Sequence, residues 1–306
     1  MTQVASEAVL AVMGPTAAGK TALAVALARA VGGELINADS RQAIAELRIG
    51  VCKPTPGELG GVPCHGLDWR RLGEPFTVAE FVALASRQLA QCREREQAPI
   101  LVGGTGLYVR ALLEGFDFGV VGEPLPSPPD PGGEDLAQAL AELERLSPAK
   151  YLEVDRRNPR RVFRALALAR SGVAAAKVRP GWRALRLGCM VPPEVLRGRI
   201  SRRSDQLVGA ALRQEVEALL DAGFPPSTIA EAAIGYREAL AWIQGAVSRE
   251  GAVAEVAQRT WRYARSQMTW LRKEPDLVWI DGTADLGKML ESALQLVERR
   301  FTKEAI

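Results

Sequence analysis

The sequence predicts an α/β fold, in which a parallel β-sheet is flanked by helices and its core is split by a helical insertion. Two observations support this prediction: apolar runs typical of buried strands alternate with helical stretches, and a segment rich in Gly and Pro interrupts the alternation. Strands that alternate with helices form a parallel sheet, whose ligands bind at the carboxyl ends of the strands. The 306 residues, 47% of them hydrophobic, suffice for a full core.

The elements can be placed by period and by terminating residues. Residues Ala8–Met13 form a continuous apolar run typical of a buried parallel strand. The Ala- and Leu-rich stretch Lys20–Val31 follows and ends at Gly32-Gly33, which predicts a helix. By the same criteria we expect further strands at 34–38, 99–102, 185–191 and 277–280, and a helix at 78–95.

A change in composition marks the domain boundary. Between about Gly115 and Pro131 the chain is rich in Gly and Pro, and LPSPPDP at 125–131 suits no regular element. Two helical patterns follow, at 135–146 and 158–170, before the sheet resumes near Ala184. We therefore expect residues 1–115 and 175–306 to form the core and residues 116–174 to form the insertion.

Charge and cysteine usage narrow the functional class. The net charge is only +3, so any affinity for nucleic acid depends on where the basic residues lie. The four cysteines have neither the spacing of a zinc site nor that of a disulfide framework, which is typical of reduced thiols and predicts a cytoplasmic protein. No run of about 18 apolar residues predicts a membrane span.

A phosphate-binding loop lies between the first predicted strand and helix. The segment GPTAAGKT matches G-x-x-x-x-G-K-[ST], so the core is expected to be P-loop NTPase-like. Backbone amides of such a loop surround an anion, Lys20 reaches the outer phosphate, and Thr21 is the expected Mg²⁺ ligand. Kinases, GTPases and diphosphate-consuming transferases all use this loop. The predicted diphosphate-binding residues are Gly14, Pro15, Thr16, Ala17, Ala18, Gly19, Lys20 and Thr21.

Further motifs follow the phosphate loop in a fixed order. They are DSRQ at 39–42, Lys53-Pro54, LVGGTGLY at 101–108, NPRR at 158–161, Arg199-Ile200 with Arg203, IGYRE at 234–238 and QMTWLR at 267–272. This ordered set covers most of the chain and resembles the tRNA dimethylallyltransferases, also called isopentenyl-diphosphate:tRNA transferases. Ile44 replaces the tyrosine and Val51 the threonine usual in that family, and Ser171–Ala174 lacks its proline and serine. These departures affect local contacts and remove no charged catalytic group.

The resemblance implies transfer of a dimethylallyl group from dimethylallyl diphosphate to N6 of the adenine next to the anticodon of tRNA. Because the N6 lone pair is delocalised into the ring, a base assists the reaction. The resemblance assigns that role to Asp39. The alternative is that Asp39 caps a helix or binds magnesium. Thr105 is expected to hydrogen-bond the reacting centre or the diphosphate, unless it only forms a tight turn.

One arginine is expected to neutralise the diphosphate as it leaves, together with Mg²⁺, Lys20 and Thr21. Arg203 matches the family's diphosphate arginine. The same segment contains four arginines, Arg197, Arg199, Arg202 and Arg203. Their spacing alone does not show which of them contacts the diphosphate and which belong to a solvated helix face.

Two acid-free basic stretches suggest an RNA-binding face. The range 156–193 contains ten Lys or Arg residues, and 259–273 interleaves basic residues with aromatic ones that either stack on bases or pack in the core. N6 lies on the Watson–Crick edge of adenine, so the target base must be unpaired, as in a single-stranded loop. The resemblance implies that this loop belongs to the tRNA anticodon stem-loop, and the insertion is expected to face it. The resemblance implies a set of tRNA-binding residues: Asp39, Ser40, Arg41, Gln42, Arg160, Arg161, Arg164, Gly235, Tyr236, Arg237, Arg265, Gln267, Trp270 and Arg272.

Three other functions share parts of this pattern. A prenyltransferase acting on free adenine nucleotides would need no long basic surface, and a nucleoside or shikimate-type kinase would use ATP as its donor. A non-catalytic RNA-binding module would not need Gly19-Lys20-Thr21 beside Asp39. The sequence indicates no obligate protein partner, and its single histidine, His65, is expected to be non-catalytic.

Overall fold

The computed structural model describes residues 8–115, 136–170 and 182–301, apart from the side chain of Arg160. The chain divides into two compact units, the first formed by Met1–Leu113 and Pro180–Ile306 and the second by Glu114–Arg179. The predicted difference at Ser171–Ala174 lies outside the described residues. Each unit has its own hydrophobic core and is described by itself.

Unit 1 is built on a six-stranded sheet in which every pair of neighbouring strands is parallel, which confirms the predicted fold class. The strand order is β3-β2-β4-β1-β5-β6, so β1 lies inside the sheet, with Val12 opposite Val102 on β4 and Leu187 on β5. All six residues of β1 are buried, as its continuous apolar sequence predicts. The strands are β1 (Ala8–Met13), β2 (Gly33–Asn37), β3 (Cys64–His65), β4 (Ala98–Gly103), β5 (Arg183–Met190) and β6 (Leu277–Asp281).

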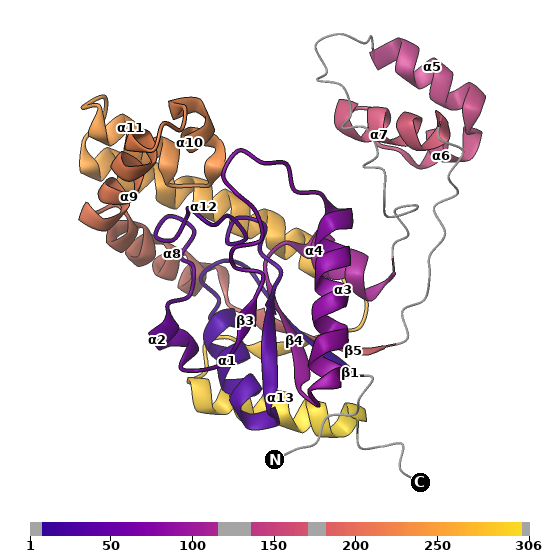
Figure 1. The fold of residues 1–306 in the computed structure, drawn as a ribbon, viewed down its shortest axis with the longest axis vertical. Helices are drawn as coiled ribbons and strands as arrows, with labels where there is room; N and C mark the ends of the chain where they lie inside the picture. The colour runs from indigo at the N-terminus through magenta and orange to yellow at the C-terminus, as the bar shows by residue number, and fades with distance from the viewer. Residues whose placement is uncertain (1–7, 116–135, 171–181, 302–306) are drawn as a thin grey trace. The chain divides into compact units, whose positions relative to one another are not determined.

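Helices cover both faces of this sheet (Figure 1). Leu10 and Val12 of β1 pack with α1 (Lys20–Val31), α8 (Pro193–Leu207) and α13 (Leu286–Phe301). Val9 and Ala11 point to the opposite face, towards α3 (Val78–Glu94), α4 (Gly106–Leu113) and α12 (Arg249–Leu271). Helix α1 ends where Gly32 adopts a left-handed conformation, with φ of 65°, as the Gly-Gly pair predicts.

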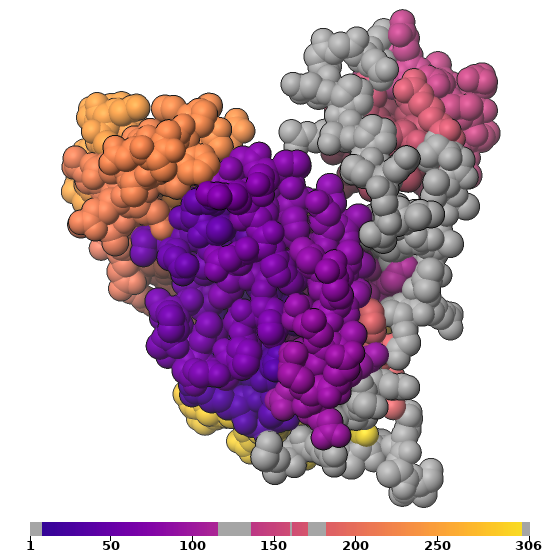
Figure 2. All heavy atoms as spheres, in the orientation of Figure 1, coloured from indigo at the N-terminus to yellow at the C-terminus, as the bar shows by residue number. Residues whose placement is uncertain are grey.

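A third cluster of apolar residues joins the segment after β2 to a group of short helices, and the contact is visible in Figure 2 between the purple and orange surfaces. Ile44 and Leu47 pack there against α9 (Ala210–Asp221), α10 (Pro226–Ala232) and α11 (Tyr236–Ile243). Ile44, one of the departures from the family pattern, is 1% exposed, so it serves this core. Nearby, α2 (Pro56–Leu59) begins with a capping box formed by Thr55 and Glu58.

Unit 2 contains three described helices around a small core. They are α5 (Leu136–Leu146), α6 (Pro148–Glu153) and α7 (Pro159–Arg170), and Leu143, Val162 and Phe163 are among the residues buried between them. Arg170 on α7 forms an ion pair with Glu142 on α5, with 2.6 Å between Nη2 and Oε2.

The two-residue strand β3 is the element of the sheet that the sequence did not predict. It adds Cys64 and His65 to the edge of the sheet beside β2, and two residues are too few for a periodic signal. Within the described residues, every helix is too short or too polar to cross a membrane.

Candidate active site

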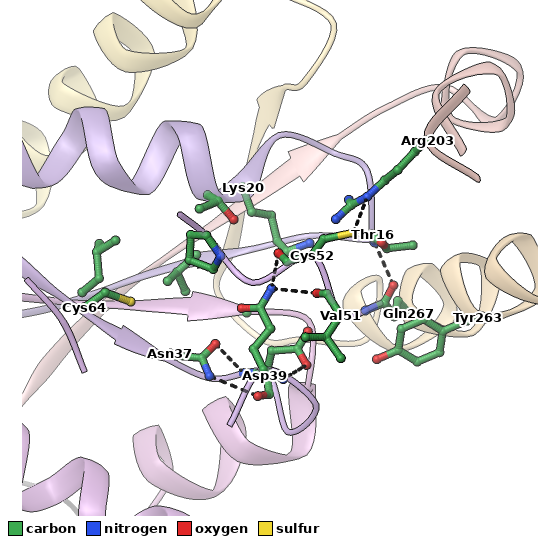
Figure 3. A pocket seen from close by; sticks show the side chains of 16 residues that line it. Thr16, Lys20, Asn37, Asp39, Val51, Cys52, Cys64, Arg203, Tyr263 and Gln267 are labelled. Carbon is green, nitrogen blue, oxygen red and sulfur yellow. Dashed lines mark hydrogen bonds between the residues drawn. The ribbon is translucent and has the colours of Figure 1, made fainter. Parts of the chain in front are cut away.

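A cavity of about 100 Å³ lies at the carboxyl ends of β2 and β4, beside the loop between β1 and α1 (Figure 3). Polar side chains reach it from four parts of unit 1: Lys20 from the phosphate loop, Asp39 after β2, Arg203 from α8 and Tyr263 from α12. Its apolar wall includes Leu35, Val51, Pro54, Cys64 and Val102. The strand ends therefore bring together residues that are up to about 240 positions apart, as expected for a parallel sheet.

The phosphate loop has the strained backbone that its motif requires. Gly19, which caps α1, has φ of 87°, and Ala17 also adopts a left-handed conformation, with φ of 64°. Helix α1 begins at Lys20, so its first amides have no partner within the helix and face the loop. The ammonium group of Lys20 folds back over the loop and donates to the carbonyl of Pro15 at 2.7 Å. Thr21 also lines the cavity.

The charge of Lys20 is influenced by three neighbours. The pKa of Lys20 is lowered to about 8, mainly by burial and also by the charge of Arg203, while Cys189 and Asp39 act in the opposite direction. A bound diphosphate would place negative charge beside the ammonium group and favour its protonated form. The lysine is therefore most strongly charged when an anion occupies the loop.

Asp39 combines a structural bond with a free oxygen. Its Oδ1 accepts the backbone amides of Arg41 at 2.9 Å and Gln42 at 3.4 Å, so the capping role considered from the sequence is present. Within the described residues, Oδ2 has no hydrogen-bond partner, and the residue lines the cavity. Asn37 fixes the same turn, since its Oδ1 accepts the Asp39 amide at 3.1 Å. The carboxylate is thus oriented by one oxygen and available through the other.

Thr105 lies behind the Asp39 turn. Its hydroxyl accepts the amide of Ser40 at 3.1 Å, and its own amide donates to the carbonyl of Ala38 at 3.2 Å. These bonds connect the loop after β4 with the loop after β2. The geometry gives Thr105 a contact that positions the Asp39 turn, and its direct role in the reaction stays a prediction.

The structure separates the four arginines of α8. Arg203 lines the cavity, and its Nε donates to Sγ of Cys52 at 3.1 Å (Figure 3). Arg197 packs over the ring of Trp261, with 5.2 Å between its guanidinium carbon and the ring centroid. Helical spacing alone did not show that Arg203 points into the cavity and Arg197 towards Trp261, because the difference depends on where α12 packs against α8.

Gln267 on α12 connects two of the loops around the cavity. Its Oε1 accepts the amide of Thr16 at 2.9 Å, and its Nε2 donates to the carbonyl of Gly104 at 3.1 Å. The residue is 6% exposed. Tyr263, one helical turn earlier, lines the same cavity, and burial followed by the charge of Asp39 raises its pKa to about 12. The phenol therefore stays protonated at neutral pH.

The other residues predicted to bind tRNA are distributed over both units. Arg41, Arg237, Arg265 and Arg272 are exposed in unit 1, and Arg161 is exposed in unit 2, while Arg164 is half-buried. Trp270 packs over the backbone of Gly106. Tyr236 is fully buried, and its hydroxyl donates to Glu215 at 2.6 Å. The structure gives Tyr236 and Gln267 contacts within the protein, and the RNA contacts of all these residues remain predictions.

Three residues at or behind the site were not predicted from the sequence: Asn37, Cys52 and Glu215. Asn37 ends β2 two positions before Asp39, a place where polar residues indicate a site. Tyr263 is one of the aromatic residues of 259–273 that were expected either to stack on bases or to pack in the core, and it shares a helix face with Gln267, four residues later. Cys52 and Glu215 gave no sequence signal, because their contacts join distant segments.

A polar cluster on the edge of the sheet is the described group with metal-ligand chemistry. Glu34, His65 and Cys92 lie together, and Nε2 of His65 is 2.7 Å from Oε2 of Glu34. Burial alone would raise the pKa of Glu34, but hydrogen bonds from Arg95 and His65 lower it. Because the exposed Arg95 binds both oxygens of this buried carboxylate, the cluster is best described as an ion pair at the edge of the sheet, and His65 lies outside the cavity lining.

The sequence comparisons with known proteins all point to the same family. A family model described as IPP transferase matches residues 42–274. The tRNA dimethylallyltransferase of Thermomicrobium roseum is 36% identical, over 97% of this chain and 92% of that protein. The tRNA dimethylallyltransferase 1 of Pelobacter propionicus is 36% identical, over 97% of this chain and all of that protein (100%).

Solved structures agree with the sequence matches. The full-length tRNA isopentenylpyrophosphate transferase of Bacillus halodurans superimposes with a TM-score of 0.71 and 31% identity, covering 98% of this chain and 100% of that one. The matched family range includes Gln42, Arg203 and Gln267, which line the cavity, and the relatives extend over the phosphate loop as well. With a phosphate loop, a carboxylate and an arginine at one cavity, and near full-length relatives, the chain belongs to the IPP transferase family.

Proposed function

We propose that this protein transfers a dimethylallyl group from dimethylallyl diphosphate to N6 of the adenine next to the anticodon in tRNA. The products are N6-isopentenyladenosine and diphosphate. One observation carries the proposal: Asp39, Lys20 and Arg203 line the same cavity at the end of a parallel sheet. A base for the amine and cations for the leaving group are thus available to one pair of reacting molecules.

The residues divide the work in a single displacement. The C1–O bond of the donor breaks as the N6–C1 bond forms, and the electron pair of the C1–O bond remains on the diphosphate oxygen. Lys20, Arg203 and the amides of the phosphate loop stabilise that negative charge. The free Oδ2 of Asp39 accepts the proton that N6 loses, while Oδ1 keeps its bonds to the turn. Tyr263 closes one side of the cavity with an aromatic ring.

Mg²⁺ is the cofactor that we assign to this reaction. Thr21 is the residue that would hold it, because its side chain lines both the cavity and the open groove beside it, and no hydrogen bond within the described residues engages its hydroxyl. Hydroxyl and phosphate oxygens are ligands that Mg²⁺ prefers. The ion would neutralise charge on the diphosphate.

The acceptor in this proposal is the anticodon stem-loop of tRNA. Exposed arginines are available in each unit, among them Arg161 on α7 and Arg265 on α12, and such side chains bind RNA phosphates. The adenine must be unpaired for N6 to reach Asp39, which fits a loop. A tRNA substrate places the protein in the cytoplasm, and no obligate protein partner is required for the reaction.

The test is label transfer from dimethylallyl diphosphate to an unmodified anticodon stem-loop in the presence of Mg²⁺. Wild-type protein is expected to label the RNA, and Asp39→Ala to lose most of this activity. Asp39→Asn is the matched variant, since an amide oxygen can still accept the amides of Arg41 and Gln42 but cannot take a proton. A loss of about 100-fold or more in kcat for Asp39→Asn, with unchanged RNA affinity, supports the base. Equal turnover of Asp39→Asn and wild type would remove Asp39 from that role.

Two binding measurements separate the alternatives. A kinase would bind ATP as its donor, so we compare ATP with dimethylallyl diphosphate in a filter assay and expect the prenyl donor to bind more tightly. Arg161→Ala is expected to weaken RNA binding and to flatten its dependence on salt, because one phosphate contact is lost. Unchanged salt dependence would mean that Arg161 does not contact RNA.

A further inference from the structure

An open groove of about 640 Å³ adjoins the cavity on the side of α8. The two share Lys20, Thr21, Cys52, Pro54 and Arg203, so the phosphate loop forms part of both walls. Asp39, Gln42 and Tyr263 line only the cavity. The groove therefore leads away from the phosphate loop without passing the proposed base.

The groove is lined by cations that the reaction as proposed does not use. Beyond Lys20 and Arg203, its wall contains the guanidinium groups of Arg48, Arg199 and Arg202. In the part of the chain that the structure describes, these three side chains form no ion pair or hydrogen bond. Arg48 and Arg202 are exposed and Arg199 is half-buried, so all three can reach an anion from solvent.

Acidic residues near the groove are already engaged. Glu58 also lines it, but its Oε2 accepts the amide and hydroxyl of Thr55 at 2.8 and 3.0 Å in the cap of α2. Asp281 lies close enough for Arg199 to contribute to its lowered pKa, but hydrogen bonds from Thr283 are the main cause. The lining contains six Lys and Arg residues and one carboxylate, that of Glu58, so the local charge of the groove is strongly positive, although the whole chain has a net charge of only +3.

Helix α8 places its arginines on two different faces. Residues 199, 202, 203 and 206 have the spacing i, i+3, i+4, i+7, and all four line the groove. The buried face, with Leu196, Ile200 and Ser204, fixes this orientation. Arg197 instead packs over Trp261. The same helix thus offers three arginines in the groove, Arg203 among them, and one outside it, which allows a matched comparison.

We propose that Arg48, Arg199 and Arg202 form a second anion site, next to the phosphate loop, that binds the diphosphate leaving group as it departs. This inference rests on the proposed function. When the C1–O bond breaks, the ester oxygen becomes a free anionic oxygen, so the diphosphate released carries more negative charge than the donor did. A cluster of guanidinium groups therefore binds the product more strongly than the esterified donor. Release along the groove leaves the acceptor side of the cavity undisturbed.

The experiment measures binding of inorganic diphosphate by titration calorimetry, in buffer with Mg²⁺ and without RNA. The variants are Arg202→Ala, the double variant Arg199→Ala/Arg202→Ala, and Arg197→Ala as the control that removes the same charge from the same helix. We expect the double variant to bind diphosphate at least about tenfold more weakly, since each charge-assisted contact contributes about a factor of ten. Arg197→Ala should stay within about twofold of wild type, as for an exposed charge.

The same variants are titrated with dimethylallyl diphosphate, and their thermal unfolding is compared to show that they fold. The proposal holds if the double variant loses more affinity for inorganic diphosphate than for the donor. It is overturned if diphosphate binding is unchanged, if Arg197→Ala weakens it equally, or if donor and product affinities fall by the same factor. Prenyl transfer is not part of this assay, so a failure of the proposed function is detected separately by label transfer.

Discussion

Replacing Glu215 with alanine is expected to destabilise unit 1 far more than replacing Glu217, two positions further along α9. Oε2 of Glu215 accepts the amides of Arg48 and Ile49, each at 2.8 Å, and Oε1 accepts the amide of Gly50 at 3.1 Å. Oε1 also accepts the hydroxyl of the fully buried Tyr236 at 2.6 Å. This carboxylate fixes the turn that precedes two residues of the cavity wall, Val51 and Cys52.

The size of the destabilisation depends on which hydrogen-bond partners of Glu215 can bind water once the carboxylate is removed. The amides at 48 and 49 are on exposed residues and can be solvated, but the amide of Gly50 and the hydroxyl of Tyr236 belong to buried residues. Each buried group without a partner costs about 1–3 kcal/mol, so Glu215→Ala should lower the free energy of unfolding by about 3–5 kcal/mol. Glu217 is exposed, and its i, i+4 ion pair with Arg213 is worth only about 0.5 kcal/mol.

The assay is urea unfolding of wild type, Glu215→Ala, Glu217→Ala and Tyr236→Phe. Tyr236→Phe should cost about 1 kcal/mol, because the carboxylate keeps its three amides and loses one hydroxyl. Combined with Glu215→Ala, it should add less than it costs alone, since its partner has already gone. If Glu215→Ala were no more destabilising than Glu217→Ala, the Glu215 carboxylate would not be the anchor of the turn at 48–50.

Three further predictions concern the phosphate loop and the backbone around it. Because the pKa of Lys20 is lowered to about 8, affinity for inorganic diphosphate should fall as pH rises through that value. In the Lys20→Arg variant the side chain stays charged, so titration calorimetry at a series of pH values should show a smaller fall in affinity. Cys52→Ala removes the acceptor of Arg203 Nε and should raise the donor KM about threefold, while Cys52→Ser should restore it; equal KM values for all three proteins would contradict this contact. Gly106→Ala should lower Tm, because its Cβ would lie 2.0 Å from an indole ring, whereas Gly198→Ala in α8 meets nothing closer than 3.9 Å and should stabilise by about 0.5–1 kcal/mol in the same thermal scan.

Local signals in the sequence were sufficient for the fold class and for most of the sheet. The apolar run at 8–13 and the helix at 20–31 were predicted with the bounds that the structure shows, because burial and the Gly-Gly terminator act within a few residues. The edge strand β3 was missed, since Cys64 and His65 pair with β2 across 29 positions. The order and register of the parallel strands depend on how the connecting helices pack on the sheet, which cannot be predicted from any single segment of the sequence.

The candidate site shows the same division. Motif order located Asp39 and Lys20, but only the folded chain shows that Oδ1 of Asp39 caps a turn while Oδ2 has no partner within the described residues. Tyr236 and Gln267 belong to motifs predicted to bind RNA, and both are buried and bonded within unit 1. A motif shows that residues belong together and does not show which atoms they use.

The sequence by itself determined the phosphate loop, the alternation of strands and helices, and the family resemblance, because these depend on neighbours along the chain. Tertiary structure decided which arginines of α8 face the groove and which packs on Trp261, since that choice depends on the surface against which α8 is buried. It also decided that Glu215, 165 residues or more from the turn at 48–50, supplies the acceptor for its amides. A buried amide needs a partner, and sequence distance places no limit on where that partner comes from.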